Sequence, residues 1–327
     1  MSVSDRAGAV VTDDRPGPID AVPVRHPGRW VAVAVIVVLL LMFLHLTLTN
    51  DRFNWSFVFQ AMNQKPVING LLRGTLLVTV GSMIVGIVLG IILAVMRLSP
   101  NPVLSYAAWG FVWFFRAIPR YVLLFMIGNL AFLLPRLDIG IPFDWIVTDL
   151  LGLGVDFRFL GFSTQQIGSS IAGGILGLGL SEAAYMAEIA RAGILSVDTG
   201  QEEAAQALGM SRGKTMRRIV LPQAMRVIVP PTGNETIAMV KDTSLLIALP
   251  LNAELFFQLR SIGSRTYQIF PVAVAATLWY LIITSVFMVG QFYLERHFGR
   301  GFGSSRPKSD ESATTAATGL RFTGGAR

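Results

Sequence analysis

Long apolar stretches without a charged residue recur along the chain and predict helices that cross a membrane. Residues 30–50, 74–96 and 266–294 contain no Asp, Glu, Lys or Arg, and about 20 apolar residues suffice to span the hydrocarbon core. Three further apolar stretches carry a few charged residues, so the whole pattern predicts six spans. They are placed at residues 30–49, 72–95, 113–134, 167–189, 224–248 and 271–294. The apolar stretch at 103–135 is too long for one straight crossing, so we expect its first part to lie along the membrane interface.

Composition supports this interpretation. Only 14% of the 327 residues are charged and 53% are hydrophobic, whereas soluble domains carry about 25% charged residues. The sequence therefore predicts an all-α polytopic membrane protein and excludes a soluble globular enzyme. The chain has no Cys, which rules out disulfides, thiolate metal sites and a cysteine nucleophile. With only three His, we also expect no histidine-based metal site.

The first apolar stretch has a competing interpretation as a signal peptide. Its run of about 20 residues is longer than the 7–15 of a signal sequence, and no A-x-A cleavage site follows it. The 29 residues that precede it are also long for the start of a signal peptide. We therefore favour a retained helix at 30–50. The segments 1–29 and 298–327 mix Gly, Ser, Thr, Pro and scattered charges, and we expect both to be disordered tails.

The distribution of basic residues predicts the orientation. An even number of spans puts both termini on one side, where the segments outside the membrane hold 16 Lys and Arg residues, against 7 on the other side. Because basic residues concentrate in cytoplasmic loops, we expect both termini to be cytoplasmic and the loop 135–165 to be external. The net charge of +7 then reflects topology, and no nucleic-acid partner is expected.

No arrangement of residues typical of an enzyme active site occurs in the chain. The segment from Gly209 to Thr215 superficially matches a phosphate-binding loop, but three residues separate its glycines where the motif requires four. We therefore expect no nucleotide site and no cofactor on this chain. If ATP drives its function, a partner chain must bind the ATP and Mg²⁺.

The segment 196–222, between the fourth and fifth spans, predicts a short helix, a sharp turn and a second helix. Thr199 and Glu202 fit a capping box that starts the first helix, and Gly209 fits a left-handed helix stop. Ser211 could cap the second helix, which we expect to end near Pro222 because proline cannot continue the hydrogen-bond ladder. Such an element suits docking on another protein, although an ordinary interfacial helix pair has the same pattern.

This segment resembles the EAA motif of the permease subunits of ABC importers. The positions that carry the likeness are Gly200, Glu203, Ala204, Ala205, Gly209, Ile219, Leu221 and Pro222. Further stretches resemble the polar amino-acid subfamily (histidine, glutamine and glutamate permeases): 74–77, 97–99, 115–119, 185–201 and 241–245. The chain departs from the subfamily at Ala117 and Ile118, where Gly-Thr is usual, and at Arg120, where Leu is usual.

The resemblance implies a fold and a function. It implies a five-helix type I importer permease domain at 69–297, to which the helix at 30–50 is an addition. The loop would dock on a cytosolic ATPase subunit, with Glu203 pairing with a basic residue of that subunit. An extracytoplasmic solute-binding protein would deliver a polar or charged amino acid, and a second permease copy or a paralogue would complete the pathway in the prokaryotic inner membrane. The alternative is a secondary transporter or channel without an ATPase partner.

Charged residues inside the predicted spans are candidates for the substrate pathway, because a charge at the bilayer centre costs about 2.5–3.5 kcal/mol. We expect Pro230 and Pro231 to break the fifth span and free backbone carbonyls there. The candidates are Arg116, Glu182, Glu235, Lys241 and Asp242. Simpler interpretations remain open: Lys241 and Asp242 could neutralise a neighbouring helix, Arg116 and Arg120 could snorkel to the interface, and Glu188 could pair with Arg191.

Overall fold

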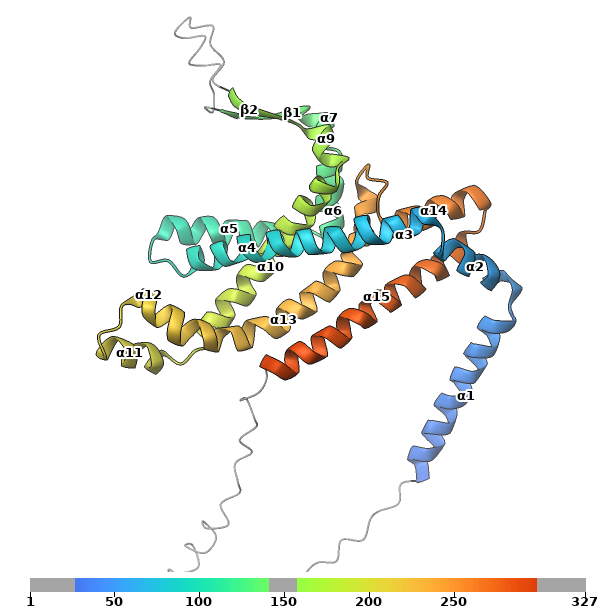
Figure 1. Ribbon diagram of the computed structural model, residues 1–327, viewed down its shortest axis with the longest axis horizontal. Helices are drawn as coiled ribbons and strands as arrows, with labels where there is room; N and C mark the ends of the chain where they lie inside the picture. The colour runs from blue at the N-terminus through green and yellow to red at the C-terminus, as the bar shows by residue number, and fades with distance from the viewer. Residues whose placement is uncertain (1–26, 141–157, 299–327) are drawn as a thin grey trace, which may run out of the picture. The chain divides into compact units, whose positions relative to one another are not determined.

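The structure is a computed structural model that describes residues 27–140 and 158–298, and these residues are almost entirely helical (Figure 1). The predicted disordered tails lie outside the described residues, apart from the start of the first helix. The chain divides into two compact units, residues 1–53 and 54–327.

The first unit contains the helix that the sequence predicts at 30–50. Helix α1 spans Pro27–Thr49 and is followed by the short 3-10 turn η1, Asp51–Phe53. The helix is long and apolar enough to cross a membrane. None of its residues is buried.

The second unit is a helical bundle with one small hairpin. Before the hairpin the elements are α2 (Trp55–Met62), α3 (Lys65–Asn69), the π turn η2 (Gly70–Leu76), α4 (Leu77–Arg97), α5 (Pro102–Ala117), α6 (Arg120–Gly128) and α7 (Leu130–Leu133). The hairpin pairs β1 (Arg136–Gly140) with β2 (Arg158–Ser163) in antiparallel fashion. After it come α9 (Thr164–Gly168), α10 (Ile171–Leu195), α11 (Thr199–Ala207), α12 (Arg212–Thr215), the π turn η3 (Met216–Val220), α13 (Leu221–Asp242), the 3-10 turn η4 (Thr243–Ala248), α14 (Leu255–Thr266) and α15 (Ile269–Phe298).

The predicted count of six spans is not confirmed. Among the described residues, three helices are long and apolar enough to cross a membrane, at Pro27–Thr49, Lys65–Arg97 and Ile269–Phe298. The pair α5 and α6 makes a fourth if it counts as one span. The predicted fourth and fifth spans form as the helices α10 and α13, whose apolar character is diluted by charged residues.

The third predicted span, 113–134, is not a single helix. Helices α5 and α6 are bent by 96° relative to each other, and the break falls at Ile118 and Pro119. Ile118 has an extended backbone because the ring of a following proline disfavours the helical region. The expectation that this stretch is too long for one straight crossing is therefore confirmed.

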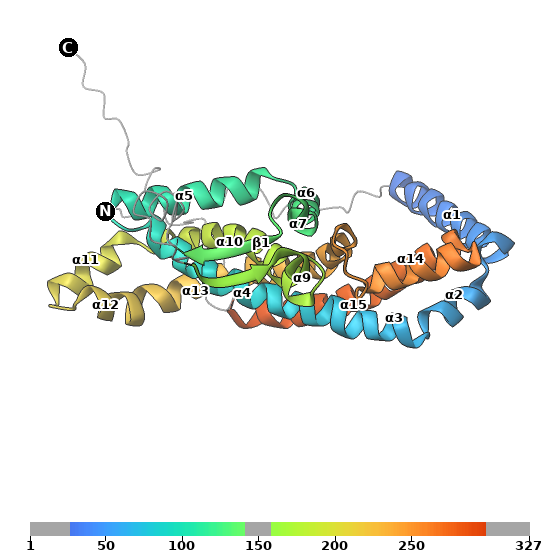
Figure 2. The ribbon, with the colours of Figure 1, turned by 90° about the horizontal axis from the view of Figure 1, so that it is seen from above.

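Glycines bring α4 and α10 into close contact. A Cβ atom at Gly86 would lie 2.6 Å from Cγ of Glu182, and one at Gly179 would lie 2.8 Å from Cβ of Val85. These distances are too short for a side chain, so glycine is required for the two helices to cross here. Figure 2 shows α10 crossing α4. The glycines on these helices thus serve helix packing, as small residues do in membrane proteins.

Helix α13 runs without a break through Pro230 and Pro231, so the expectation of a broken helix is wrong. The Nε2 atom of Gln291, on α15, donates a 2.8 Å hydrogen bond to the Pro230 carbonyl. Gly233 leaves space for the Gln291 side chain. This hydrogen bond ties the proline-containing turn of α13 to α15. The carbonyls that lose their N–H partners to the two prolines are those of Arg226 and Val227, four residues earlier.

Glu254 holds α14 against two other elements and is completely buried. Its Oε2 atom caps α14 by accepting hydrogen bonds from the backbone N–H groups of Phe256 (2.7 Å) and Phe257 (3.1 Å). Its Oε1 atom accepts from the hydroxyls of Tyr280 (2.6 Å) and Thr75 (3.1 Å). One carboxylate thus joins α14, α15 and η2.

We expect Glu254→Ala to lower the free energy of unfolding by about 3 kcal/mol, because it leaves several buried donors without partners. Thermal and SDS-induced unfolding of the purified chain would measure the change. Glu203→Ala is the control, because Glu203 is an exposed carboxylate with no side-chain hydrogen bond in the described part of the chain, and we expect about 0.5 kcal/mol or less. Equal losses for the two variants would contradict the assigned role of Glu254.

Candidate functional site

The first half of the loop 196–222 forms the predicted short helix and sharp turn. Helix α11 ends at Ala207 and is followed by Gly209 with φ of +75°. The N–H of Met210 donates to the Ala205 carbonyl (3.0 Å) and the N–H of Gly209 donates to the Gln206 carbonyl (2.9 Å). This pair of bonds is a Schellman motif, which needs a left-handed residue and so favours glycine. The predicted role of Gly209 as a helix stop is confirmed.

The start of α11 differs from the predicted capping box. The N-cap residue is Asp198 rather than Thr199, and its Oδ1 atom accepts a 2.7 Å hydrogen bond from the N–H of Gly200. Aspartate caps a helix at least as well as threonine, so the N-cap lies one residue earlier than predicted. Thr199 becomes the first helical residue.

The second helix continues past Pro222, contrary to the expectation that it ends there. Helix α12 begins after Ser211, whose side chain makes no capping hydrogen bond. The wide turn η3, which contains Ile219, joins α12 to α13. Pro222 falls in the first turn of α13, where a missing N–H is tolerated. Leu221 lines an apolar cavity of about 480 Å³ between α4, α10, α13 and α15.

The outward face of α11 carries the exposed residues of the motif. Ala205 is buried and faces inward, whereas Glu203, Ala204 and Leu208 are exposed. Glu203 lies two residues from Ala205 and so points away from it, roughly 200° around the helix. Leu208 is 82% exposed, which is unusual for a large apolar side chain beside a rigid turn.

The strongest electrostatic feature is a cluster of carboxylates around Arg120, at the start of α6. Its Nη2 atom lies 2.9 Å from Oε2 of Glu182 on α10 and 3.8 Å from Oε2 of Glu235 on α13. Its Nη1 atom pairs with Asp242 at the end of α13. Three of the predicted pathway residues are therefore brought together by three helices.

The cluster holds more negative than positive charge. Within residues 27–140 and 158–298, Arg120 is the only basic side chain that forms an ion pair with these three carboxylates. Glu182 is completely buried, and its Oε1 atom has no hydrogen-bond partner among the described residues. The side chains of Glu235 and Asp242 are 27% and 30% exposed. A ligand could therefore approach the cluster from the side of these two residues.

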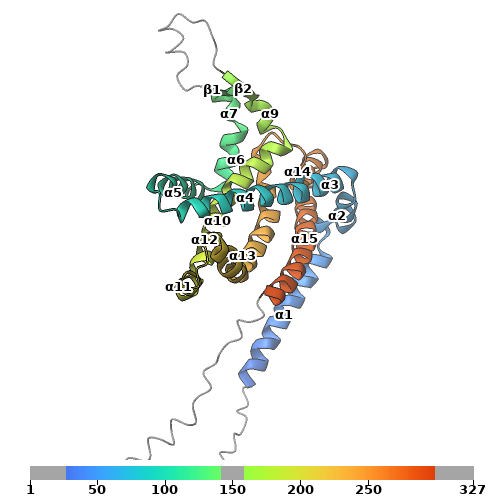
Figure 3. The same cartoon turned by 60° about the vertical axis from the view of Figure 1, so that its left-hand side comes forward.

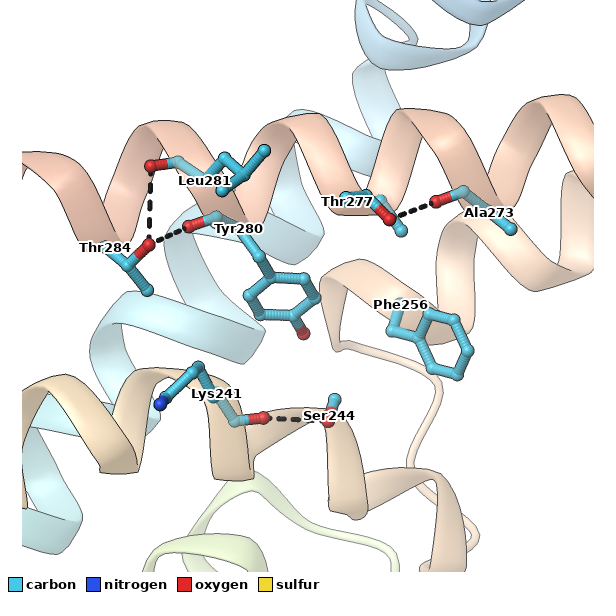
Figure 4. Close-up of a pocket in the computed structure, with 9 residues that line it drawn as sticks. Lys241, Ser244, Phe256, Ala273, Thr277, Tyr280, Leu281 and Thr284 are labelled. Atoms are coloured by element: carbon cyan, nitrogen blue, oxygen red, sulfur yellow. Dashed lines mark hydrogen bonds between the residues drawn. The ribbon is translucent and has the colours of Figure 1, made fainter. Parts of the chain in front are cut away.

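Arg116 and Lys241 do not join the cluster. The guanidinium of Arg116 lies 5.4 Å from the ring centroid of Tyr185, which also lies 4.7 Å from the guanidinium of Arg120. Lys241 lines a separate cavity of about 440 Å³ between the end of α13, η4, α14 and α15. Figure 4 shows Lys241 in this cavity with the ring of Tyr280. Lys241 and Asp242 are neighbours in the sequence, yet their side chains lie in different environments.

Glu188 and Arg191 form the predicted pair on α10. The Nε and Nη2 atoms of Arg191 donate to Oε2 of Glu188 at 3.1 and 2.9 Å. Arg97 reaches the other oxygen of Glu188 at 4.0 Å. Glu182 and Glu188 therefore face different directions, as their spacing predicts. No group of three or more His, Asp or Glu arranged for a metal ion occurs in the described part of the chain.

The structure is a multi-pass helical bundle with a short helix-turn-helix element between α10 and α13. Residues 86–300 match the family described as the binding-protein-dependent transport system inner membrane component, and the chain belongs to that family. This membership confirms the resemblance, makes the chain a membrane subunit of an ATP-driven importer and sets aside the secondary transporter.

The chain is similar to the permeases of an arginine and a nopaline transport system. The chain is 44% identical over 287 residues to an arginine transport system permease of Corynebacterium glutamicum, and the match covers 88% of this chain and 85% of the relative. It is 35% identical to a nopaline transport system permease of Agrobacterium fabrum, over 71% of this chain and 89% of the relative. A crystal structure of an amino acid ABC transporter with histidines has a chain 29% identical, with a TM-score of 0.55 and coverage of 71% and 94%.

Proposed function

We propose that this chain is the permease of an importer for cationic amino acids of the arginine type. The observation that carries the proposal is the cluster of Glu182, Glu235 and Asp242, which Arg120 alone balances among the residues that the structure describes. Such a site attracts a cation and repels an anion. The arginine permease relative supports the same substrate class.

The geometry of the cluster fits a guanidinium. Arg120 places one such group among three carboxylates and near an aromatic ring, and planar donors suit paired carboxylate oxygens. A substrate guanidinium or ammonium would use the partly exposed oxygens of Glu235 and Asp242. In this role Arg120 holds the carboxylates close together, and Glu182 fixes Arg120 from the buried side.

The loop 196–222 would couple this site to a separate cytosolic ATPase. Glu203 on the outward face of α11 and Leu208 directly after this helix supply one charge and one exposed apolar side chain for a groove on that partner. The residues of the motif that shape the loop are Gly200, Ala204, Ala205, Gly209, Ile219, Leu221 and Pro222. ATP and Mg²⁺ would bind to the partner, and this chain would carry no catalytic residue.

The remaining parts of the assembly follow from the family. A second copy or a paralogue of the permease would complete the pathway, and an extracytoplasmic solute-binding protein would deliver the substrate. The loop 196–222 and the termini would face the cytoplasm, where basic residues concentrate. The hairpin β1–β2 would then be external, because α10 separates it from α11 (Figure 3).

Substrate selectivity tests the proposed function. We expect Asp242→Asn to raise the KM for arginine uptake about tenfold or more, because a hydrogen bond between charged groups is lost. Uptake of radiolabelled arginine would be measured in cells that carry the variant as their only copy. Competition by unlabelled arginine, lysine, glutamine and glutamate would rank the substrates.

A matched variant separates the cluster from other carboxylates. Glu188→Gln changes a carboxylate on α10 that pairs with Arg191 and lies outside the cluster, so we expect little change in KM for arginine. If glutamate competes as well as lysine does, or if Asp242→Asn leaves the KM for arginine unchanged, the cationic substrate class is wrong.

A further inference from the structure

The hairpin β1–β2 has one apolar face and one polar face. Leu137 pairs with Phe162 and Ile139 pairs with Leu160, and directly paired residues in an antiparallel ladder point to the same side. Four large apolar side chains therefore share one face of only two strands. They are 39% to 58% exposed, so nothing in the described chain covers them.

The opposite face is built from polar groups. Arg136 and Asp138 form an ion pair with 3.6 Å between Nε and Oδ1. Gly161 lies across from Asp138, and a Cβ atom there would be 2.6 Å from Oδ1 of Asp138. The missing side chain lets the ion pair lie over this face. Phe159, which is 72% exposed, lies at the irregular end of the hairpin between Arg158 and Leu160. Away from that end the two faces are chemically distinct.

The hairpin is attached firmly at its base. The hydroxyl of Thr164 donates a 2.5 Å hydrogen bond to the Leu134 carbonyl, and its N–H donates a 3.2 Å bond to the Pro135 carbonyl. Thr164 itself is buried. These bonds hold the residue that follows β2 beside the residues that precede β1, so the end of the bundle determines where the hairpin starts.

We propose that the apolar face of this hairpin lies on the lipid interface of the membrane, at the end of the bundle opposite α11. Exposed apolar side chains recur along the chain from α6 to the hairpin. They include Phe125 and Met126 on α6, and Phe132 and Leu133, which are 86% and 81% exposed. Residues 130–135 contain no polar side chain. No polar residue in this segment therefore marks the edge of the membrane before β1.

Contact with lipid would stabilise the hairpin. A two-stranded hairpin alone is at best marginally stable in water, and an amphipathic element with its apolar side in the headgroup region gains stability from burial. Arg136 at the edge of the strands would lie among the headgroups. Lipid is favoured over a protein partner because the exposed apolar residues 132–134 lie directly between the hairpin and α6, which belongs to a candidate membrane span.

The experiment uses the absence of cysteine in the chain. Leu137→Cys and Leu160→Cys would each report on the apolar face, and Arg136→Cys, one residue away, on the polar face. Each full-length variant is labelled with an NBD fluorophore and reconstituted in nanodiscs of phosphatidylcholine and phosphatidylglycerol, with or without doxyl-labelled lipid. Ile139→Cys and Phe162→Cys serve as second variants if a first one fails to fold, and retained uptake shows that a variant is folded.

We expect doxyl lipid to reduce the fluorescence at Leu137→Cys and Leu160→Cys about twofold and to leave Arg136→Cys nearly unchanged, because the apolar face enters the boundary between headgroups and acyl chains. Aqueous iodide should give the reverse order. Equal iodide quenching at all three positions would overturn the proposal. Protection of Leu137→Cys and Leu160→Cys that arises only when the solute-binding protein is added would also overturn it and would assign the face to that protein.

Discussion

Glu203→Arg is expected to reduce substrate uptake about 100-fold, because reversing a charge at a protein interface costs several kcal/mol. Glu203 is exposed on the face of α11 opposite the buried Ala205. Its side chain supports no hydrogen bond within the described chain, so the fold should be unaffected. The measurement is uptake in cells, together with co-purification of the ATPase subunit and the amount of inserted permease.

Gln201→Arg is the matched control for this prediction. Gln201 is also exposed on α11 but is two residues from Glu203, so it points in a different direction. We expect it to retain most of the uptake. Gly209→Val tests the loop independently, because φ of +75° is strained for a β-branched residue. Normal uptake and ATPase association in both Glu203→Arg and Gly209→Val would refute the coupling role.

Arg120→Met is expected to lower the free energy of unfolding by about 3–5 kcal/mol, the cost of removing one partner from a buried ion pair. The side chain of Arg120 is only 12% exposed, and its loss leaves the carboxylates of Glu182, Glu235 and Asp242 close together without a cation. We also expect uptake to be lost. Thermal unfolding of the purified chain and arginine uptake would be measured together.

Two variants separate charge from geometry in this cluster. Arg120→Lys retains the charge but cannot contact two carboxylates with a planar fork, so we expect an intermediate loss. Adding Glu182→Gln to Arg120→Met removes one unpaired carboxylate and should recover part of the stability, as a double-mutant cycle would show. If the double variant is destabilised by the sum of the single effects, the two residues are not coupled.

The loop 196–222 could be predicted well because its structure is local. A left-handed glycine, a run of helix formers and a capping residue lie within a dozen positions, so the turn at Gly209 is encoded where it forms. The errors were also local. Asp198 caps α11 in place of the predicted Thr199. The second helix does not end near Pro222, because the turn η3 leads directly into α13.

The prolines show how far the effect of one residue type can be predicted from the sequence. Pro119 in the sequence marks the break between α5 and α6, and the bend of 96° follows the change in backbone at Ile118. By contrast, Pro230 and Pro231 did not break α13. At this turn α13 is packed against α15, where Gln291 hydrogen-bonds to the Pro230 carbonyl.

By itself the sequence determined that this protein crosses a membrane, that it carries an EAA-type loop and that a few charges lie inside its helices. Those features depend on composition and on residues close together in the chain. Only the tertiary structure decided which charges meet. Asp242 lies against Arg120 while its neighbour Lys241 faces another cavity, because the packing of α6, α10 and α13 sets the direction of each side chain. The same packing, made possible by glycines such as Gly86, buries Glu182 beside Arg120.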